Sequence, residues 1–343
     1  MLDSRLAIVR ATHLSDYISV LRAIGAPVDR ELARSSLPPR IEETPDLYVS
    51  VLVAIEWIAR TGHDLELMEL GLLGAQKASL SSLRPAQRAA IMTAQTGLQR
   101  LEALAALSRI EDSALQMSIR YETDEVRVIC DMADLGRHPF VCLAEWLNLQ
   151  AVISVVRSVA GLSWCPSELC FVSSNRVPPA VQAAFPNTRI LVGQRHTCVV
   201  VERAALARTT HHTIASSCDG SAATAIGTER DGQTAAWDFA SLLRMLVQPY
   251  LNQGCPDVAF AAELAGISTR TLQRRLKQCG SSYSKILKEA RFELACTCLG
   301  DPALKVIDVA MMAGYGCPQH FTRAFRRFGG ITPTEYRHIV STL

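Results

Sequence analysis

The sequence predicts an α+β N-terminal domain of helices plus antiparallel hairpins, followed by an all-α domain with two tandem helix-turn-helix subdomains. Three observations lead to this prediction. The apolar residues change from a helical to an alternating period after residue 110, lose any period over 208–233, and return to a helical period after Trp237. A chain of 343 residues is also long enough for two cores of ordinary size.

Helical and alternating patterns follow one another through the N-terminal domain. The segments with a helical period are 14–25, 46–59, 84–109 (one or two helices, interrupted near Thr96-Gly97) and 140–160. Alternating apolar residues predict one hairpin from 115–121 and 126–130, and a second from 189–192 and 197–201 around Gly193-Gln194. Hairpins of this kind favour antiparallel over parallel pairing.

The segment 208–236 is rich in Thr, Ser, Ala and Gly and has no apolar period. It is predicted to be a linker between an N-terminal domain, 1–207, and a C-terminal domain, 237–343. The charge differs between the two sides. The last 107 residues hold 13 Lys+Arg and 8 Asp+Glu, a net charge of +5, whereas the first 236 carry a net charge of −3. This asymmetry indicates either a negatively charged partner at the C-terminal end or a solvated basic face.

The overall composition is that of an ordinary globular protein. Apolar residues make up 49% of the chain and charged residues 20%, which excludes a disordered, collagen-like or coiled-coil protein. The most apolar stretch, 141–161, contains Glu145, Asn148, Gln150 and Arg157 and is too polar to span a bilayer. Charged residues also interrupt the first ten positions, unlike a signal peptide. We expect a cytoplasmic protein with no membrane partner.

One helical unit occurs twice in the C-terminal domain. Residues 258–266 align with 306–314 at an offset of 48, and past the glycine the offset becomes 49. Each copy is predicted to be a helix, a glycine turn and a second helix, over 258–280 and 306–329. Gly266 and Gly314 provide the left-handed turn conformation, and Ser268 is expected to cap the helix that follows it.

The second helix of each copy has two chemically different faces. Leu272 and Leu276 face inward in the first copy, and Phe321 and Phe325 face inward in the second. The outward positions are Thr269, Arg270, Gln273, Arg274, Pro318, Gln319, Thr322 and Arg323. Arg can form two hydrogen bonds with guanine and Gln can do so with adenine. Three further basic residues suit phosphate contacts: Arg275, Lys277 and Arg326. Two tandem basic faces favour binding of double-stranded DNA over two α-hairpins that only pack together.

The last ~105 residues resemble the DNA-binding domain of the AraC/XylS family of bacterial transcription regulators. The resemblance runs through 261–299 and 306–337 and includes the ending Gly-Ile-Thr-Pro-Thr-Glu-Tyr-Arg at 330–337. It implies two helix-turn-helix subdomains joined by a long helix, about 283–299, and two recognition helices in adjacent major-groove segments. It also assigns base reading to the eight outward positions. The second recognition helix departs from the family, because Cys317, a poor cap, replaces the usual Ser.

The N-terminal ~200 residues are similar to the arabinose-binding-like domain of one AraC branch, which includes regulators resembling those of ornithine use. The similar stretches are 57–74, 115–130 and 186–206. This resemblance implies an effector-sensing or dimerisation domain and a homodimer, but does not identify the effector. It further implies a transcription activator that contacts RNA polymerase, although no residue distinguishes activation from repression.

Other functional classes have weaker support in the sequence. The chain has no GxGxxG, GxxxxGK[ST], HExxH or GxSxG motif, and the acidic residues of the N-terminal domain are scattered. We therefore expect no enzymatic activity and no cofactor. Trp57 and Trp146 lie in apolar helices and are expected in the core.

A thiol- or metal-responsive regulator is the alternative, because the chain has eleven cysteines. Cys165 and Cys170 flank a short loop, whereas Cys296 and Cys298 lie two apart on a helix and point in different directions. The pair His211-His212 has only Cys218 and Asp219 nearby as further ligands, so a solvated linker explains it better than a metal site. We expect no metal site and mostly buried, reduced thiols.

Overall fold

The computed structural model describes residues 6–78, 80–132, 135–136, 138–207, 238–253 and 256–341. The predicted linker, 208–236, lies outside the described residues together with its histidine pair, so the predicted domain boundaries stay predictions. By its contacts the chain divides into two compact units. The HTH unit comprises Met1–Ser15, Asp29–Ala54 and Phe239–Leu343, and the sheet unit comprises Asp16–Val28 and Ile55–Asp238.

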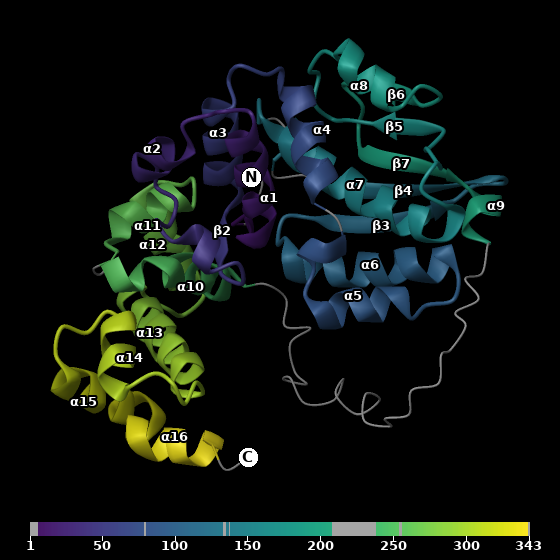
Figure 1. Cartoon of the computed structure of the whole chain (residues 1–343). Helices are drawn as coiled ribbons and strands as arrows, with labels where there is room; N and C mark the ends of the chain where they lie inside the picture. Colours follow the sequence, from purple (N-terminus) through teal and green to yellow (C-terminus); the bar gives the residue numbers. More distant parts are fainter. Residues whose placement is uncertain are drawn as a thin grey trace. The chain divides into compact units, whose positions relative to one another are not determined.

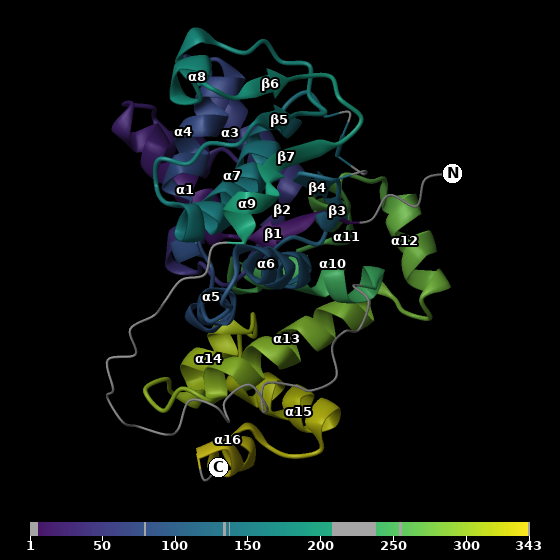
Figure 2. The same cartoon turned by 90° about the vertical axis from the view of Figure 1, so that its right-hand side faces the viewer.

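The sheet unit is built around five strands in the order β3-β4-β7-β5-β6 (Figures 1 and 2). Their bounds are β3 Gln116–Tyr121, β4 Glu125–Asp131, β5 Glu168–Cys170, β6 Arg189–Leu191 and β7 Thr197–Glu202. The first predicted hairpin is confirmed as the antiparallel pair β3–β4, with Tyr121 opposite Val126. All neighbouring strands are antiparallel except β5 and β6, which are parallel. The fold of this unit is α+β, as predicted.

The second predicted hairpin, 189–192 with 197–201, is wrong. Strand β5 lies between β6 and β7, so these two strands do not pair. The turn at Gly193-Gln194 is bonded to the segment after β5 instead: the Gly193 amide donates to the Ser173 carbonyl at 2.8 Å, and the Gln194 amide donates to the Phe171 carbonyl at 2.8 Å. The sequence pattern missed β5 because three residues are too few to show an alternation.

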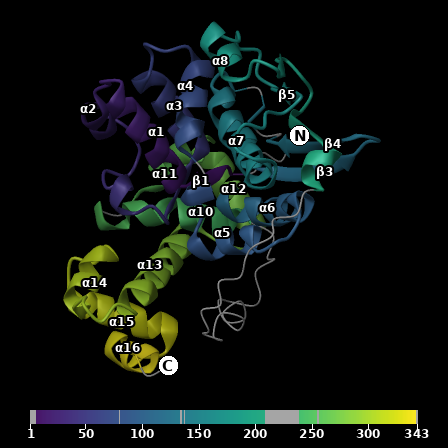
Figure 3. The same ribbon diagram turned by 45° about the vertical axis from the view of Figure 1, so that its right-hand side comes forward.

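Helices α4, α6 and α9 pack on α7 in the sheet unit. The helices of this unit are α4 Leu67–Lys77, α5 Pro85–Met92, α6 Gly97–Glu111, α7 Val141–Ala160, α8 Pro179–Ala184 and α9 Arg203–Leu206, whereas α1 Thr12–Ala23 and α3 Val51–Thr61 begin in the HTH unit and end in the sheet unit. Helix α4 packs directly on α7 (Figure 3). A Cβ atom at Gly71 would collide with the ring of Trp146, so glycine allows this close approach. Trp57 and Trp146 are both buried in the core, as expected.

A fully buried carboxylate connects α7 to the sheet. Glu145 on α7 accepts hydrogen bonds from the Val172 amide at 2.6 Å, the Ser173 amide at 3.3 Å and the Thr197 hydroxyl. These donors replace the hydration that the buried charge has lost. Because Thr197 points toward α7, the alternation along β7 puts Cys198 on the opposite face of the sheet.

The HTH unit consists mainly of helices. Its elements from the first part of the chain are β1 Ile8–Arg10, α2 Val28–Ala33, the 3-10 helix η1 Ile41–Glu43 and β2 Tyr48–Ser50. Those from the last part are α10 Phe239–Val247, the 3-10 helix η3 Gln248–Gln253, α11 Val258–Leu264, α12 Thr269–Gln278, α13 Tyr283–Leu299, α14 Val306–Met312, α15 Pro318–Gly329 and α16 Pro333–Ser341. From Phe239 onward the described residues form helices and connecting segments only, which confirms the all-α prediction.

The predicted helix over 46–59 begins later than expected. Tyr48–Ser50 forms β2, which pairs antiparallel with β1, and α3 starts at Val51. The apolar run around Val49 suits a buried strand as well as a helix, and the pairing with a distant segment decides between them. Within the described residues, no helix combines the length and the apolar character needed to cross a membrane.

Candidate DNA-binding interface

The first helix-turn-helix unit consists of α11 and α12, and side chains cap both helices. The Asp257 carboxylate accepts a hydrogen bond from the Phe260 amide at 2.7 Å, and the Ser268 hydroxyl accepts one from the Thr271 amide at 3.2 Å. Gly266 forms the turn with a φ of 63°, in the left-handed region that favours glycine. The cap expected at Ser268 is therefore formed.

Helix α12 separates its apolar and polar faces as the period predicted. Leu272 and Leu276 are buried. The side chains left exposed include Arg270, Gln273 and Arg274, and Thr269 is half-buried at the first turn. The exposed face therefore offers guanidinium and amide groups that can reach base edges, and assignment to particular bases stays a prediction.

The second helix-turn-helix unit consists of α14 and α15 and is capped differently. The Asp308 carboxylate accepts a hydrogen bond from the Lys305 amide at 3.3 Å at the start of α14. Cys317, at the N-cap of α15, makes no side-chain bond to a helix amide, and its thiol donates to the Gln319 side-chain oxygen instead. Pro318 at the first helical position removes one of the amides that would need a partner.

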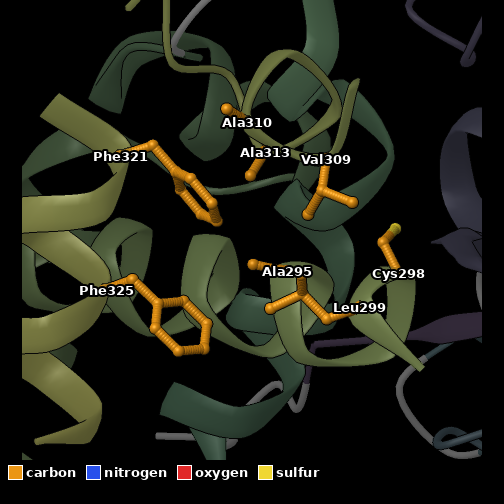
Figure 4. Packing of buried hydrophobic residues seen from close by; sticks show 8 residues of the cluster. All are labelled: Ala295, Cys298, Leu299, Val309, Ala310, Ala313, Phe321 and Phe325. Carbon is orange, nitrogen blue, oxygen red and sulfur yellow. The ribbon is translucent and has the colours of Figure 1, made fainter. Parts of the chain in front are cut away.

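Helix α15 inserts two aromatic rings into the core of its unit. Phe321 and Phe325 point toward α13 and α14 (Figure 4), where the cluster is completed by Ala295, Cys298, Leu299, Val309, Ala310 and Ala313. On the other side of α15, Gln319 and Arg323 are exposed. Thr322 is half-buried, and its hydroxyl donates to the Pro318 carbonyl at 3.0 Å, so this hydroxyl must change partner before it can bond a base.

A groove of about 600 Å³ lies between α13 and α15. Lys288 and Arg291 of α13 line it, together with Arg323 and Arg327 of α15. Its floor is aromatic, and Phe328 there is 49% exposed. Lys288, Arg291 and Arg327 are not among the site residues predicted from the sequence. The three-residue spacing of Lys288 and Arg291 on one helix was the available signal.

Positive charge is concentrated on α12 and α15. Together α12 and α15 hold seven of the 13 Lys+Arg residues that follow Trp237, and none of the eight Asp+Glu. Acidic residues of α13 are paired elsewhere: Arg244 of α10 lies 3.4 Å from the Glu289 carboxylate and 2.9 Å from that of Glu293. A polyanion therefore meets little opposing charge on these two helices.

The three residues predicted to contact phosphate have different surroundings. The Arg275 guanidinium lies 5.4 Å from the centre of the Phe239 ring, so it also stabilises the packing of α10. Lys277 is exposed. Arg326 is exposed near Glu335, whose pKa is held below its usual value by hydrogen bonds from Thr332 and by attraction to Arg326. Their phosphate contacts stay predictions.

The first helix-turn-helix unit is also contacted by a segment from the first part of the chain. The Ser36 hydroxyl donates to the Glu263 carboxylate of α11 at 2.8 Å, and the Tyr250 hydroxyl donates to the Ser36 carbonyl at 2.7 Å. Burial raises the pKa of Tyr250 above its ordinary value, which keeps this hydroxyl a donor. Segment 29–54 therefore stabilises the position of α11 through the hydrogen bonds of Ser36.

Several known proteins are similar to this chain. A family model described as a helix-turn-helix domain matches residues 261–339. The chain is 23% identical over 335 residues to the HTH-type transcriptional regulator VirS of Mycobacterium tuberculosis, covering 96% of each chain. It is 34% identical over 82 residues to the ornithine utilization regulator of Pseudomonas aeruginosa, covering 24% of each. Among solved structures, the transcriptional regulator CdpR of Pseudomonas aeruginosa matches with a TM-score of 0.41 and 20% identity, over 95% of this chain and 96% of that one.

Proposed function

We propose that this chain, which has a helix-turn-helix domain over residues 261–339 and is similar to HTH-type transcriptional regulators, is a DNA-binding transcriptional regulator of the AraC type that recognises a specific DNA site through both α12 and α15. One observation carries the proposal. Each of these helices buries its apolar face in its own unit while it exposes Arg and Gln side chains and holds no acidic residue. Base reading is assigned to the outward residues of both helices, and phosphate binding to the basic residues beside them.

Helix α13 connects the two units, so one chain can contact two successive major-groove segments. The spacing we expect between them is about one DNA turn, roughly 10 base pairs. A homodimer covers two such double sites. Footprinting at saturating protein tests this arrangement, because a single short protected segment contradicts a dimer.

The regulatory role is assigned to the N-terminal part of the chain. This part acts by binding a small effector or by self-association. A cavity of about 400 Å³ in the sheet unit supports the effector role. It lies where α6, the β3–β4 hairpin and α9 meet, and its lining includes Leu98, Tyr121, Val126 and Arg203. The exposed Arg203 guanidinium suits an effector with a carboxylate group. We further propose that the regulator acts in the cytoplasm as an activator, through contact with RNA polymerase, and has no catalytic step.

The decisive experiment is selection of bound fragments from a genomic DNA library by the purified full-length protein, with and without reducing agent. Recovery of one directional motif in both conditions supports sequence-specific regulation. If bound fragments share no motif at any salt concentration, and binding persists only through the charge of the DNA, specific recognition is contradicted. Addition of carboxylate effectors to the same selection tests control through the cavity.

The alternative is a thiol- or metal-responsive regulator. One observation favours a response through thiols. Within the described residues, no three His, Cys, Asp or Glu side chains converge as metal ligands would. Two of the described cysteines, however, lie directly opposite each other in the sheet.

A further inference from the structure

Cys170 and Cys198 form a cross-strand pair. Cys170 is the last residue of β5, and Cys198 lies opposite it on the antiparallel neighbour β7. Residues opposite one another in an antiparallel ladder have Cα atoms about 4.5–5.5 Å apart. A disulfide spans Cα separations of about 4.4–6.8 Å. The backbone therefore already provides the separation that a disulfide needs, and both cysteines are free thiols here.

The other nearby cysteines do not compete for this partner. Cys130 on β4 is opposite Thr197, which points toward α7, so Cys130 lies on the other face of the sheet from Cys198. Cys165 precedes β5, and its sulfur accepts a hydrogen bond from Arg157 at 3.8 Å. Cys165 and Cys170, which flank the short loop, are therefore not the pair that the strands bring together.

Charged groups surround the pair at its solvent side. The Cys170 thiol donates to the Glu168 carboxylate at 3.3 Å. Glu168 also accepts from Arg127 at 3.1 Å and from Arg189 at 2.6 Å. The Arg189 side chain is 72% exposed, so this network is open to water and small solutes although each cysteine is only 5% exposed. Positive charge beside a thiol favours its reactive thiolate form.

The two thiols differ in acidity. Interaction with the neighbouring Cys170 thiol and attraction to Arg127 lower the pKa of Cys198 below its ordinary value, although burial opposes them. The same interaction raises the pKa of Cys170, as do burial and the Glu168 carboxylate. Cys198 is therefore the more acidic of the two thiols and the better nucleophile of the pair. In contrast, burial raises the pKa of Cys142 to about 12, which makes it a poor nucleophile.

We propose that Cys170 and Cys198 form a peroxide-reactive dithiol that closes to a cross-strand disulfide. The Cys198 thiolate attacks one oxygen of hydrogen peroxide, an S–O bond forms, the O–O bond breaks, and the departing hydroxide takes a proton to become water. Cys170 then attacks the sulfur of the resulting sulfenic acid. An S–S bond forms, the S–O bond breaks, and a second water leaves with the proton of Cys170. The two thiols lose two electrons, and one peroxide is reduced to two waters.

The first test uses the full-length wild-type protein and a covalent readout, so it does not depend on the proposed DNA binding. Reduced protein is treated with hydrogen peroxide for increasing times, alkylated, digested without reductant and analysed by mass spectrometry. The expected product is a Cys170–Cys198 cross-link, formed at least about tenfold faster than the exposed Cys279 is oxidised. A link between Cys165 and Cys170, or earlier oxidation of Cys279, overturns the proposal.

Variants separate the two steps. In Cys170→Ser, the reaction is expected to stop at the Cys198 sulfenic acid, which a cyclic 1,3-diketone traps. In Cys198→Ser, Cys170 is expected to stay reduced. Cys165→Ser is the matched control and should form the cross-link at the wild-type rate. Oxidation of Cys170 at an unchanged rate in Cys198→Ser contradicts the assigned nucleophile. Thermal unfolding checks that each variant folds, and Cys198→Ala replaces Cys198→Ser if serine destabilises the strand.

Discussion

Leucine side chains form the core of the first helix-turn-helix unit, and aromatic rings form the core of the second. In the first unit, Leu272 and Leu276 fill the space under α12. In the second, the Phe321 and Phe325 rings lie with their centres 5.7 Å apart, and Phe292 of α13 lies 4.8 Å from Phe325. The two units therefore share the glycine turn and the division of the second helix into an apolar and a polar face, but the residues of their cores differ.

The two units also differ at their helix starts and in their neighbours. Ser268 caps α12 with a hydrogen bond, whereas Cys317 leaves the start of α15 without one. The turn glycine of the first unit faces a side chain, Leu52, and that of the second faces the backbone carbonyl of Leu251. A repeated motif therefore fixes the backbone path, while each copy obtains its stability from different contacts.

The largest expected difference between the two helix-turn-helix units is the loss of stability when the turn glycine is replaced by alanine. Gly314 has a φ of 75°, and a Cβ there would collide with the Leu251 carbonyl, which cannot move aside. We expect Gly314→Ala to lower the free energy of unfolding by about 3–5 kcal/mol. Gly266→Ala should cost about 1–2 kcal/mol, because its Cβ would meet only the Leu52 side chain, at 2.8 Å. Urea unfolding of both variants gives the comparison, and equal losses contradict the role of the Leu251 carbonyl.

The contributions of α12 and α15 to the free energy of DNA binding are expected to differ less. Arg274→Ala should weaken binding to the selected site by about 1–3 kcal/mol and relax base choice at one position. Arg323→Ala should fall at the lower end of that range, because Lys288 and Arg327 line the same groove and retain its positive charge. Competition binding against sites randomised at each position measures both. An equal loss on specific and random DNA excludes direct base readout by Arg274.

The helix caps should give smaller effects of opposite sign. Ser268→Ala removes a capping hydrogen bond and should cost about 1 kcal/mol of stability. Cys317→Ser supplies the missing cap and should add about 0.5–1 kcal/mol. Thermal unfolding checks both variants, with Cys317→Ala as the control that removes the thiol without adding a cap. If serine and alanine at 317 behave alike, the start of α15 is not limited by its cap.

The smallest effect is expected for a substitution in the groove between α13 and α15. Lys288→Ala should lower affinity for specific and random DNA alike and reduce the salt dependence of binding by about one phosphate contact. Lys285→Ala is the matched control on the same helix, because its ammonium lies 3.9 Å from the Glu289 carboxylate and is partly neutralised. Titrations at several salt concentrations give the slopes. Equal slopes for the two variants show that the groove holds no phosphate.

Local signals made the helix-turn-helix helices predictable from the sequence. The helix predicted to follow the Ser268 cap is α12, because a capping serine, a turn glycine and an apolar stripe all lie within a few residues of it. The packing of Arg275 on Phe239 was not predictable in the same way. Its partner is 36 residues upstream, and no short pattern connects the two.

Long-range pairing explains what the sequence did not reveal. Strand β5 is three residues long and is defined by partners such as Val200, which is far along the chain from Glu168. The strand β2 depends in the same way on β1. The groove of the second unit was also missed, because the approach of α13 to α15 decides which cations share it. Faces of helices follow from a period, whereas grooves and strand order follow from the tertiary fold.

The strand order also determines when the sheet can be completed during synthesis. Strand β7 is the last of the five to be made, yet it lies at the centre and pairs with β4 on one side and β5 on the other. Until Thr197–Glu202 leaves the ribosome, the β3–β4 hairpin and the β5–β6 pair have unpaired apolar edges that can associate with other chains. The nascent chain therefore depends on the prompt arrival of β7, which joins the two pieces into one sheet.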